Sequence, residues 1–164
     1  MARRATILRD WDTALDAEVV LATPELRAAY VRMVAGMRAL SDTDRTRLAE
    51  QQTSDGEHFV ELWVAMQTSR WEWNDLGSSR SLWTITLRDG DGRSVESIER
   101  NQLSHKPIEL GELFPGVGPF TLGWRVRFPT TFPDGTPVLR PDLRQLSARF
   151  AGPLGQADVL WQSR

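Results

Sequence analysis

Residues 119–129, PFTLGWRVRFP, constrain the fold of this chain more than any other stretch. Large apolar residues alternate there with smaller or charged ones: Phe120, Leu122, Trp124, Val126 and Phe128. Because side chains of a β-strand point alternately to opposite faces, this pattern predicts a strand with one face in a core. Arg125 and Arg127 fall on the other face, which we expect to contact water and to pair with acids of residues 57–119.

Other short stretches also favour β-strands, because apolar, β-branched or aromatic residues alternate in them and Gly-, Pro- and Asp-rich turns separate them. Residues 89–92, Asp-Gly-Asp-Gly, predict a hairpin turn, since both residue types adopt positive φ at little cost. Residues 1–14 predict an irregular arm or a short edge strand. The other expected strands lie at residues 15–23, 57–68, 82–88, 93–100, 108–110, 143–151 and 157–162.

A helical insert interrupts this pattern after the first strand. Residues 23–25, Thr-Pro-Glu, are typical of a helix start. Thr is a good N-cap, Pro is tolerated at the first helical position, and an acid complements the positive end of the helix dipole. Apolar residues then follow at helical spacing as far as residue 40. Ser41 and Asp44 form a variant of the capping box and predict a second, polar helix. We expect the insert to span about residues 24–52.

The length and composition are consistent with one domain. The chain has 164 residues, enough to bury a core without covalent staples. It has no cysteine, which excludes disulfides, a thiol nucleophile and a cysteine-based zinc site. We therefore expect a mostly β single domain, an antiparallel β-sandwich of about seven strands with its core at residues 57–162.

Charge and hydropathy exclude several partners and compartments. The net charge is −2 and no segment carries a clustered basic stripe, so we expect no nucleic-acid binding. No apolar run is long enough for a transmembrane segment, and the N-terminal stretch lacks the apolar part of an export signal. The chain as written fits the cytoplasm; the periplasm or cell envelope would fit if a leader has been removed.

No motif predicts a catalytic residue, a metal or a cofactor. His58 lies in an expected strand and His105 in an expected loop, and we interpret both as structural or solvated. The sequence lacks a nucleophile elbow and a metalloprotease helix. The Gly-Val-Gly at residues 116–118 precedes a strand, the wrong context for a phosphate loop. We interpret Asp89 and Asp91 as solvated turn residues.

The candidate ligand-binding site is a loop rich in tryptophan. Its residues are Trp71, Trp73, Asn74 and Asp75. Aromatic faces beside amide and carboxylate groups are typical of platforms that bind a carbohydrate or a peptide. In the alternative interpretation, both tryptophans close one end of the core and Asp75 caps a turn.

In general character, the alternating strands and proline-rich loops resemble immunoglobulin-like sandwiches, although the Cys–Trp–Cys spacing of true members is absent. The resemblance implies an architecture and assigns no residue a role. Our leading hypothesis is a non-enzymatic binding or structural module with an aromatic face for a protein or carbohydrate partner. By analogy of fold type, it would be an accessory domain of a bacterial cell envelope.

Two other hypotheses belong to different functional classes. One is a glycan-acting hydrolase that uses acids near the tryptophans, namely Glu61, Glu72 and Asp75. The other is a homo-oligomeric scaffold that buries the apolar stripe of helix 24–40 against a second copy.

Overall fold

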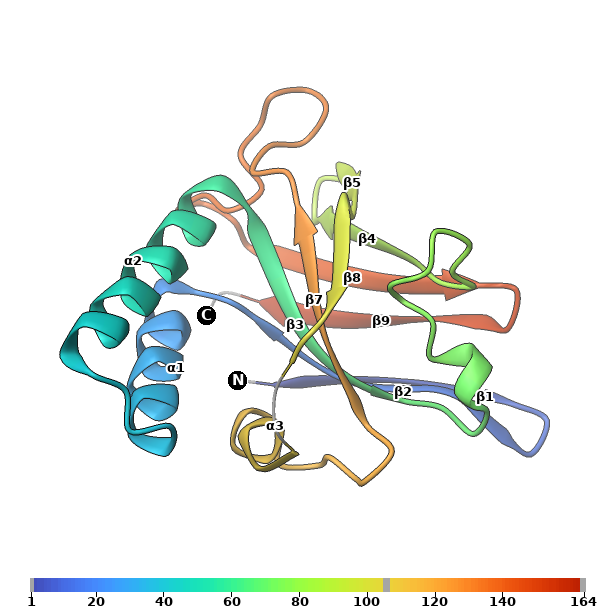
Figure 1. Cartoon of the computed structure of the whole chain (residues 1–164). Helices are drawn as coiled ribbons and strands as arrows, with labels where there is room; N and C mark the ends of the chain where they lie inside the picture. Colours follow the sequence, from blue (N-terminus) through green and yellow to red (C-terminus); the bar gives the residue numbers. More distant parts are fainter. Residues whose placement is uncertain (1, 105–106, 163–164) are drawn as a thin grey trace.

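The computed structural model describes residues 2–104 and 107–162, and His105 lies outside them (Figure 1). The described residues form nine β-strands, three α-helices and one short 3₁₀ helix. The fold is mostly β, as expected, with more strands than the seven that the sequence suggested. The helices are α1 (Pro24–Met37), α2 (Asp42–His58) and α3 (Pro107–Leu113), and the 3₁₀ helix is η1 (Trp71–Trp73).

The strands form two antiparallel sheets in a sandwich-like arrangement (Figure 1). The larger sheet has five strands in the spatial order β1-β2-β3-β7-β6, and the smaller has four in the order β5-β4-β8-β9. Strands of the larger sheet are β1 (Arg3–Arg9), β2 (Asp12–Leu21), β3 (Val60–Gln67), β6 (Glu99–Gln102) and β7 (Leu122–Phe128). Strands of the smaller sheet are β4 (Thr84–Asp89), β5 (Ser94–Glu96), β8 (Gln145–Gly152) and β9 (Gly155–Gln162).

Three segments differ from the sequence-based expectation. The N-terminal residues form the regular edge strand β1, paired along its length with β2. The strand expected at 93–100 divides into β5 and β6, one in each sheet. The backbone N–H of Ser97 donates to the Ile85 carbonyl of the smaller sheet, and the next N–H, of Ile98, donates to the Arg127 carbonyl of the larger sheet. The prediction of a strand at 108–110 is wrong, since these residues lie in α3. The immunoglobulin-like character and the single-domain boundaries stay predictions.

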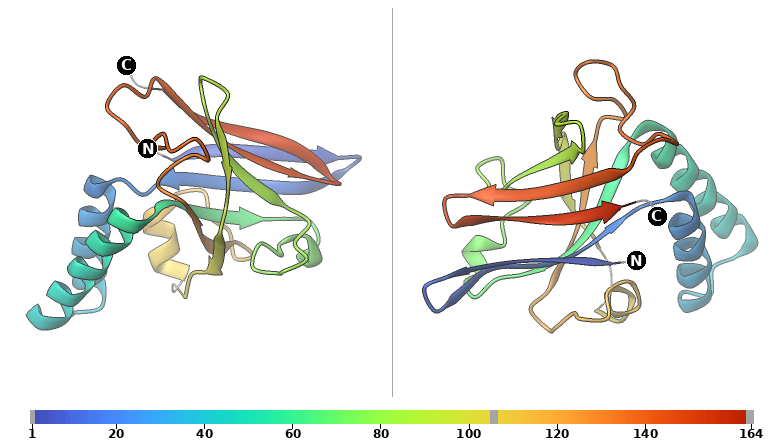
Figure 2. Two further views of the ribbon diagram at one scale, coloured as in Figure 1. Left: turned by 90° about the horizontal axis from the view of Figure 1, so that it is seen from above. Right: turned by 180° about the vertical axis from the view of Figure 1, so that it is seen from behind.

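The helical insert is longer than its predicted end at residue 52. Thr23 caps α1 through its side chain, which accepts from the Leu26 N–H, and Ser41 caps α2 by accepting from the Asp44 N–H, as expected. Helix α2 continues to His58, so β3 begins only at Val60. Figure 2 shows α1 and α2 projecting from the sheets as a hairpin.

The alternation in residues 119–129 correctly predicts the inner face of β7, which lies between β3 and β6. Trp124, Val126 and Phe128 of β7 are buried between the two sheets, and Phe120 is exposed just before the strand begins. Neighbouring strands add inward-facing side chains to the same core, including Leu15, Val19, Leu62, Val64, Met66, Ile85, Leu87 and Phe150. The core therefore also draws on β2, outside the predicted span 57–162.

The expectation of a wet outer face on β7 is wrong, because the helices cover it. A second apolar cluster joins Val20 and Trp63 of the large sheet to Leu110 and Phe114, in and just after α3. A Cβ on Gly123 would lie 2.7 Å from Leu110 Cδ2, so this glycine lets α3 approach the strand closely. The outer face of the large sheet is consequently buried where the helices lie on it, whereas β1 at its edge stays exposed. Charged groups in the covered part need partners within the protein.

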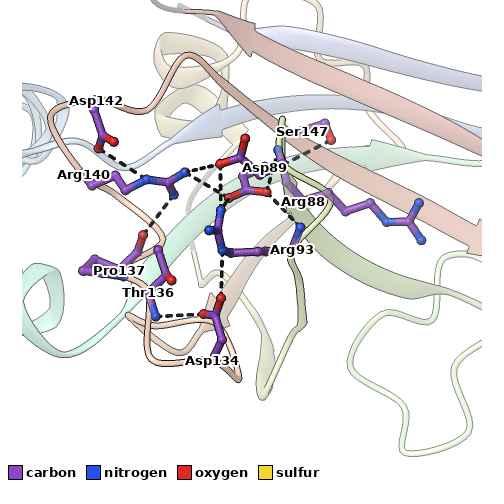
Figure 3. Close-up of polar contacts among 10 residues, drawn as sticks. Arg88, Asp89, Arg93, Asp134, Thr136, Pro137, Arg140, Asp142 and Ser147 are labelled. Atoms are coloured by element: carbon purple, nitrogen blue, oxygen red, sulfur yellow. Dashed lines mark hydrogen bonds and ion pairs between the residues drawn. The ribbon is translucent and has the colours of Figure 1, made fainter.

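The turn at residues 89–92 anchors the long loop that follows β7 (Figure 3). Asp89 is buried, contrary to the expectation of a solvated acid, because its carboxylate organises the turn. Its Oδ1 accepts from the backbone N–H groups of Asp91 and Arg93, and its Oδ2 accepts from the guanidinium groups of Arg93 and Arg140. Arg93 also bonds Asp134 across the loop, which fixes the loop against β4.

We predict that Asp89→Asn destabilises the protein by about 2 kcal/mol near neutral pH, because it removes charge-assisted hydrogen bonds. Burial alone would raise the pKa of Asp89, but the hydrogen bonds from Arg93 and Arg140 lower it below its ordinary value. A lowered pKa contributes stability above the unfolded-state pKa, and this contribution is lost as the pH falls through the folded-state pKa. The variant should therefore also lose stability less steeply on acidification.

Urea unfolding at neutral pH and at several values between about pH 5 and pH 2 measures both effects. Asp91→Asn is the matched control, because the exposed Asp91 carboxylate contacts the same two arginines. Equal stabilities for the two variants across the whole range would contradict the assigned role of Asp89.

Candidate functional site

The structure places the tryptophan loop between β3 and β4, where its polar side chains serve the fold. Asn74 Nδ2 donates to the Met66 carbonyl, and Asn74 Oδ1 accepts from Trp124 Nε1. The Asp75 carboxylate accepts from the Ser81 hydroxyl and from the Leu82 N–H, which is the turn-capping role of the alternative interpretation.

The two tryptophans of the loop differ in environment. Trp73 is half-buried against the main core, with the Arg70 guanidinium 4.9 Å from the centre of its ring. Trp71 is 82% exposed. Of the four predicted residues, Trp71 offers the most exposed aromatic surface for a ligand, and a binding role for this group stays a prediction.

A further exposed tryptophan, Trp11, belongs to the same end of the molecule. It lies in the β1–β2 turn and is fully exposed. This turn and η1 lie at the same end of the molecule (Figures 1 and 2). An ion pair of 3.2 Å joins Asp12, next to the turn, to Arg70, next to η1. Sequence reasoning missed Trp11, although its place between two aspartates was a signal for an exposed turn.

A second candidate site is a pocket between α1, α2 and the start of β3. Its volume is about 530 Å³. Its walls are mostly apolar and include Ala28, Val31, Ala49, Phe59, Val60 and Leu139. Large side chains fill the space between the sheets, among them Trp83, Phe128 and Phe150, so this pocket lies outside the main core.

Three buried polar side chains contribute to the pocket lining: Arg27 of α1, Gln52 of α2 and Glu61 of β3. Arg27 Nε donates to the Ala22 carbonyl at 3.1 Å, and Nη1 donates to Gln52 Oε1 at 3.0 Å. The nearest Glu61 oxygen lies 3.6 Å from Nη1. Among the described residues, Arg27 Nη2 has no hydrogen-bond partner.

A glycine in α2 makes room for Arg27. A Cβ on Gly56 would lie 3.2 Å from Arg27 Nε, so a larger side chain would press on the guanidinium. Arg27 belongs to the first turn of α1, which begins directly beyond the end of β2, and this position brings it over the sheet. Its aliphatic stem and charged group are thus enclosed by two helices and a strand.

Glu61 connects the pocket to a buried ion-pair network on the outer face of the large sheet. Its Oε1 accepts from Trp63 Nε1 at 2.6 Å, and its Oε2 accepts from Arg127 Nε at 3.0 Å. Arg127 lies opposite Glu61 in the β3–β7 register and opposite Glu99 in the β6–β7 register. The expected cross-strand pairing of Arg127 is confirmed, with Asp55 of α2 as a further partner at 2.7 Å.

Arg127 remains charged in this setting. Burial alone would lower the pKa of its guanidinium, but the hydrogen bonds to Glu61 and Glu99 raise the pKa above its ordinary value. The ring of Phe59 lies 4.6 Å from the guanidinium carbon and covers one face of the charge.

The histidine and the acids named as catalytic candidates lie apart. His58 is exposed at the end of α2, with Nδ1 2.7 Å from the Ser54 carbonyl oxygen. Glu61 lies near the start of β3, whereas Glu72 and Asp75 follow its far end, so the structure does not bring these acids together. In residues 2–104 and 107–162, no group of three or more His, Asp and Glu side chains could hold a metal ion.

Comparison of the chain with protein-family models, with curated proteins and with solved structures gave no match. None of the helices in the described part of the chain is long and apolar enough to cross a membrane.

We predict that Glu61→Gln destabilises the protein by about 3 kcal/mol, because it leaves two buried arginines without this carboxylate. Glu99→Gln is the control: the Glu99 side chain is more exposed and binds the same Arg127, so its loss should cost less than about 1 kcal/mol. Urea unfolding compares the two. Similar small losses would show that the Glu61–Arg127 pair contributes no more than a surface pair.

Proposed function

We propose that this chain is a non-enzymatic binding module that takes a small, largely apolar molecule between α1, α2 and β3. The observation that carries the proposal is a largely apolar pocket between two helices and a strand, with the buried polar side chains of Arg27, Gln52 and Glu61 in its lining. Its volume of about 530 Å³ falls in the range of pockets that enclose small ligands. Ligand pockets are typically apolar with a few fixed polar groups, which describes this lining.

Polar contacts attach α2 beside the pocket, from Gln52 to Arg27 and from Asp55 to Arg127. Gln52 is the one residue of this helix that is buried.

We predict that Ala49→Trp blocks the pocket, because Ala49 of α2 lines it and a large ring would occupy its space. The neutral fluorescent probe N-phenyl-1-naphthylamine should bind the wild type and should bind the variant at least about tenfold more weakly. Gln51→Trp is the control, since Gln51 is an exposed neighbour on the same helix. Unchanged probe binding in Ala49→Trp, or none in the wild type, would refute this site.

A second candidate function is binding of a protein or carbohydrate partner at the end that carries Trp11 and Trp71. The support is the exposure of two whole indole rings on adjacent loops, an arrangement that favours contact with a partner surface. The bacterial cell-envelope location stays an expectation by analogy.

The remaining hypotheses have less support. A glycan hydrolase needs two acids in one cleft, and Glu61 lies at the opposite end of β3 from the tryptophan loop. A scaffold through helix 24–40 needs an exposed apolar stripe, whereas Val31 and Val34 of α1 are buried within the molecule.

We predict that Trp11→Phe and Trp71→Phe each reduce the iodide-quenchable tryptophan emission with less than about 0.5 kcal/mol loss of stability, because both rings are solvent-exposed. Trp73→Phe is the internal control; its ring packs on the core, so stability should fall and quenchable emission should change less. A blue shift of the wild-type emission on titration with a neutral oligosaccharide would support carbohydrate as the partner. Protection of Trp71 from iodide would remove this candidate.

A further inference from the structure

We infer that the end of the molecule that carries Trp11 and Trp71 docks on the surface of an electrically neutral lipid bilayer. The inference rests on the exposed tryptophans of the second candidate function and names a different partner for them. The α1–α2–β3 pocket takes no part in it.

The most exposed large apolar side chains among the described residues gather at this end. They are Leu8 (71% exposed), Trp71 (82%), Phe120 (83%) and the fully exposed Trp11. Leu8 and Trp11 belong to the end of β1 and the β1–β2 turn, Trp71 belongs to η1 after β3, and Phe120 precedes β7. Apolar groups this exposed mark a surface that contacts a partner when they lie together.

The antiparallel register of the large sheet brings these three segments together. Strands β1 and β3 end, and β2 and β7 begin, at the same end of the sheet. The Ser69 N–H donates to the Thr13 carbonyl at 2.9 Å, which joins the segment after β3 to the start of β2. The Thr121 hydroxyl donates to Gln67 Oε1 at 3.4 Å, which joins the segment before β7 to the end of β3.

The residue types at these turns are those that a bilayer surface accepts. An indole ring has an apolar body and a polar N–H, and tryptophan is enriched where lipid headgroups meet the acyl chains. Proteins that bind this interface do so in proportion to the apolar area that they bury in it. Side chains on separate turns can each enter a fluid bilayer, whereas a rigid partner would have to match the shape of all three turns.

The polar groups beside the tryptophans favour a bilayer over a carbohydrate. A sugar is oriented by hydrogen bonds from amide and carboxylate groups next to the aromatic ring. Asn74 and Asp75 already bind groups of the protein itself, and Asp12 pairs with Arg70. Insertion of apolar side chains into a bilayer requires no such directional bonds.

The charges at this end favour a neutral bilayer over an anionic one. The charged residues nearest to the two tryptophans in the sequence are Arg9, Asp10, Asp12, Arg70 and Glu72. Residues 115–121, which include Phe120, carry no charged side chain. Anionic lipids are recognised by clusters of Lys and Arg, whereas acids balance the arginines here. The partner that fits this surface is therefore a zwitterionic lipid such as phosphatidylcholine.

Co-sedimentation with sucrose-loaded phosphatidylcholine vesicles tests the inference. The wild type should sediment with the vesicles, and the double variant Trp11→Ser/Trp71→Ser should partition at least about tenfold more weakly, because it removes two large apolar groups from the interface. Replacing part of the phosphatidylcholine by phosphatidylserine should raise the partition coefficient by no more than about twofold. Both substitutions are at exposed positions, so the double variant should keep the wild-type urea midpoint.

Ile98→Ser is the matched control. Ile98 is also an exposed apolar residue, but its N–H binds the Arg127 carbonyl at the other end of β7. This variant should partition as the wild type does. Ala49→Trp should do so as well, because Ala49 lines the pocket, so the fate of the pocket does not affect this test.

The outcomes separate this inference from the second candidate function. Absence of the wild type from the vesicle pellet, or equal partitioning of the double variant, would overturn the bilayer as partner. A strong preference for phosphatidylserine would overturn its neutrality. A blue shift with a neutral oligosaccharide and no vesicle binding would leave carbohydrate as the partner of this surface, whereas protection of Trp71 from iodide would refute the surface itself.

Discussion

The structure depends on burying the part of its large sheet that the helices cover, and the buried pair of Glu61 and Arg127 is where this constraint is most severe. These residues lie opposite each other on β3 and β7, on the face that the helices cover. A buried charge is tolerated only with a partner, and the Arg127 guanidinium also reaches Asp55 of α2. The helical hairpin therefore supplies part of the charge that compensates Arg127.

The pocket follows from the way α2 is attached. Polar contacts at its base, through Asp55 and Gln52, hold the helix to the sheet and to Arg27, while its apolar contacts are few. Because the helices meet the sheet through charged and amide groups, apolar packing does not close the space between them. The same arrangement leaves Arg27 enclosed, with Nη2 unpartnered among the described residues.

The opposite end of the molecule is organised by hydrogen bonds instead of by charge burial. Asn74 joins the indole of Trp124 to the Met66 carbonyl, and Asp75 closes the turn that leads into β4. These bonds attach the loop to the sheets, and Trp71 of the same loop is exposed. The tryptophan-rich composition thus divides between core packing and a small exposed surface that includes Trp11.

Local patterns located most elements: alternation identified the buried face of β7, and Thr23 and Ser41 marked the helix starts, because both signals depend on neighbouring residues. They could not show that α3 replaces a strand, or that α1 and α3 cover the arginine face. The pocket could not be found either, since Arg27 meets Gln52 across 25 positions and Arg127 meets Glu61 across 66. Partners at such separations are chosen by the packing of the whole chain, which no local spacing records.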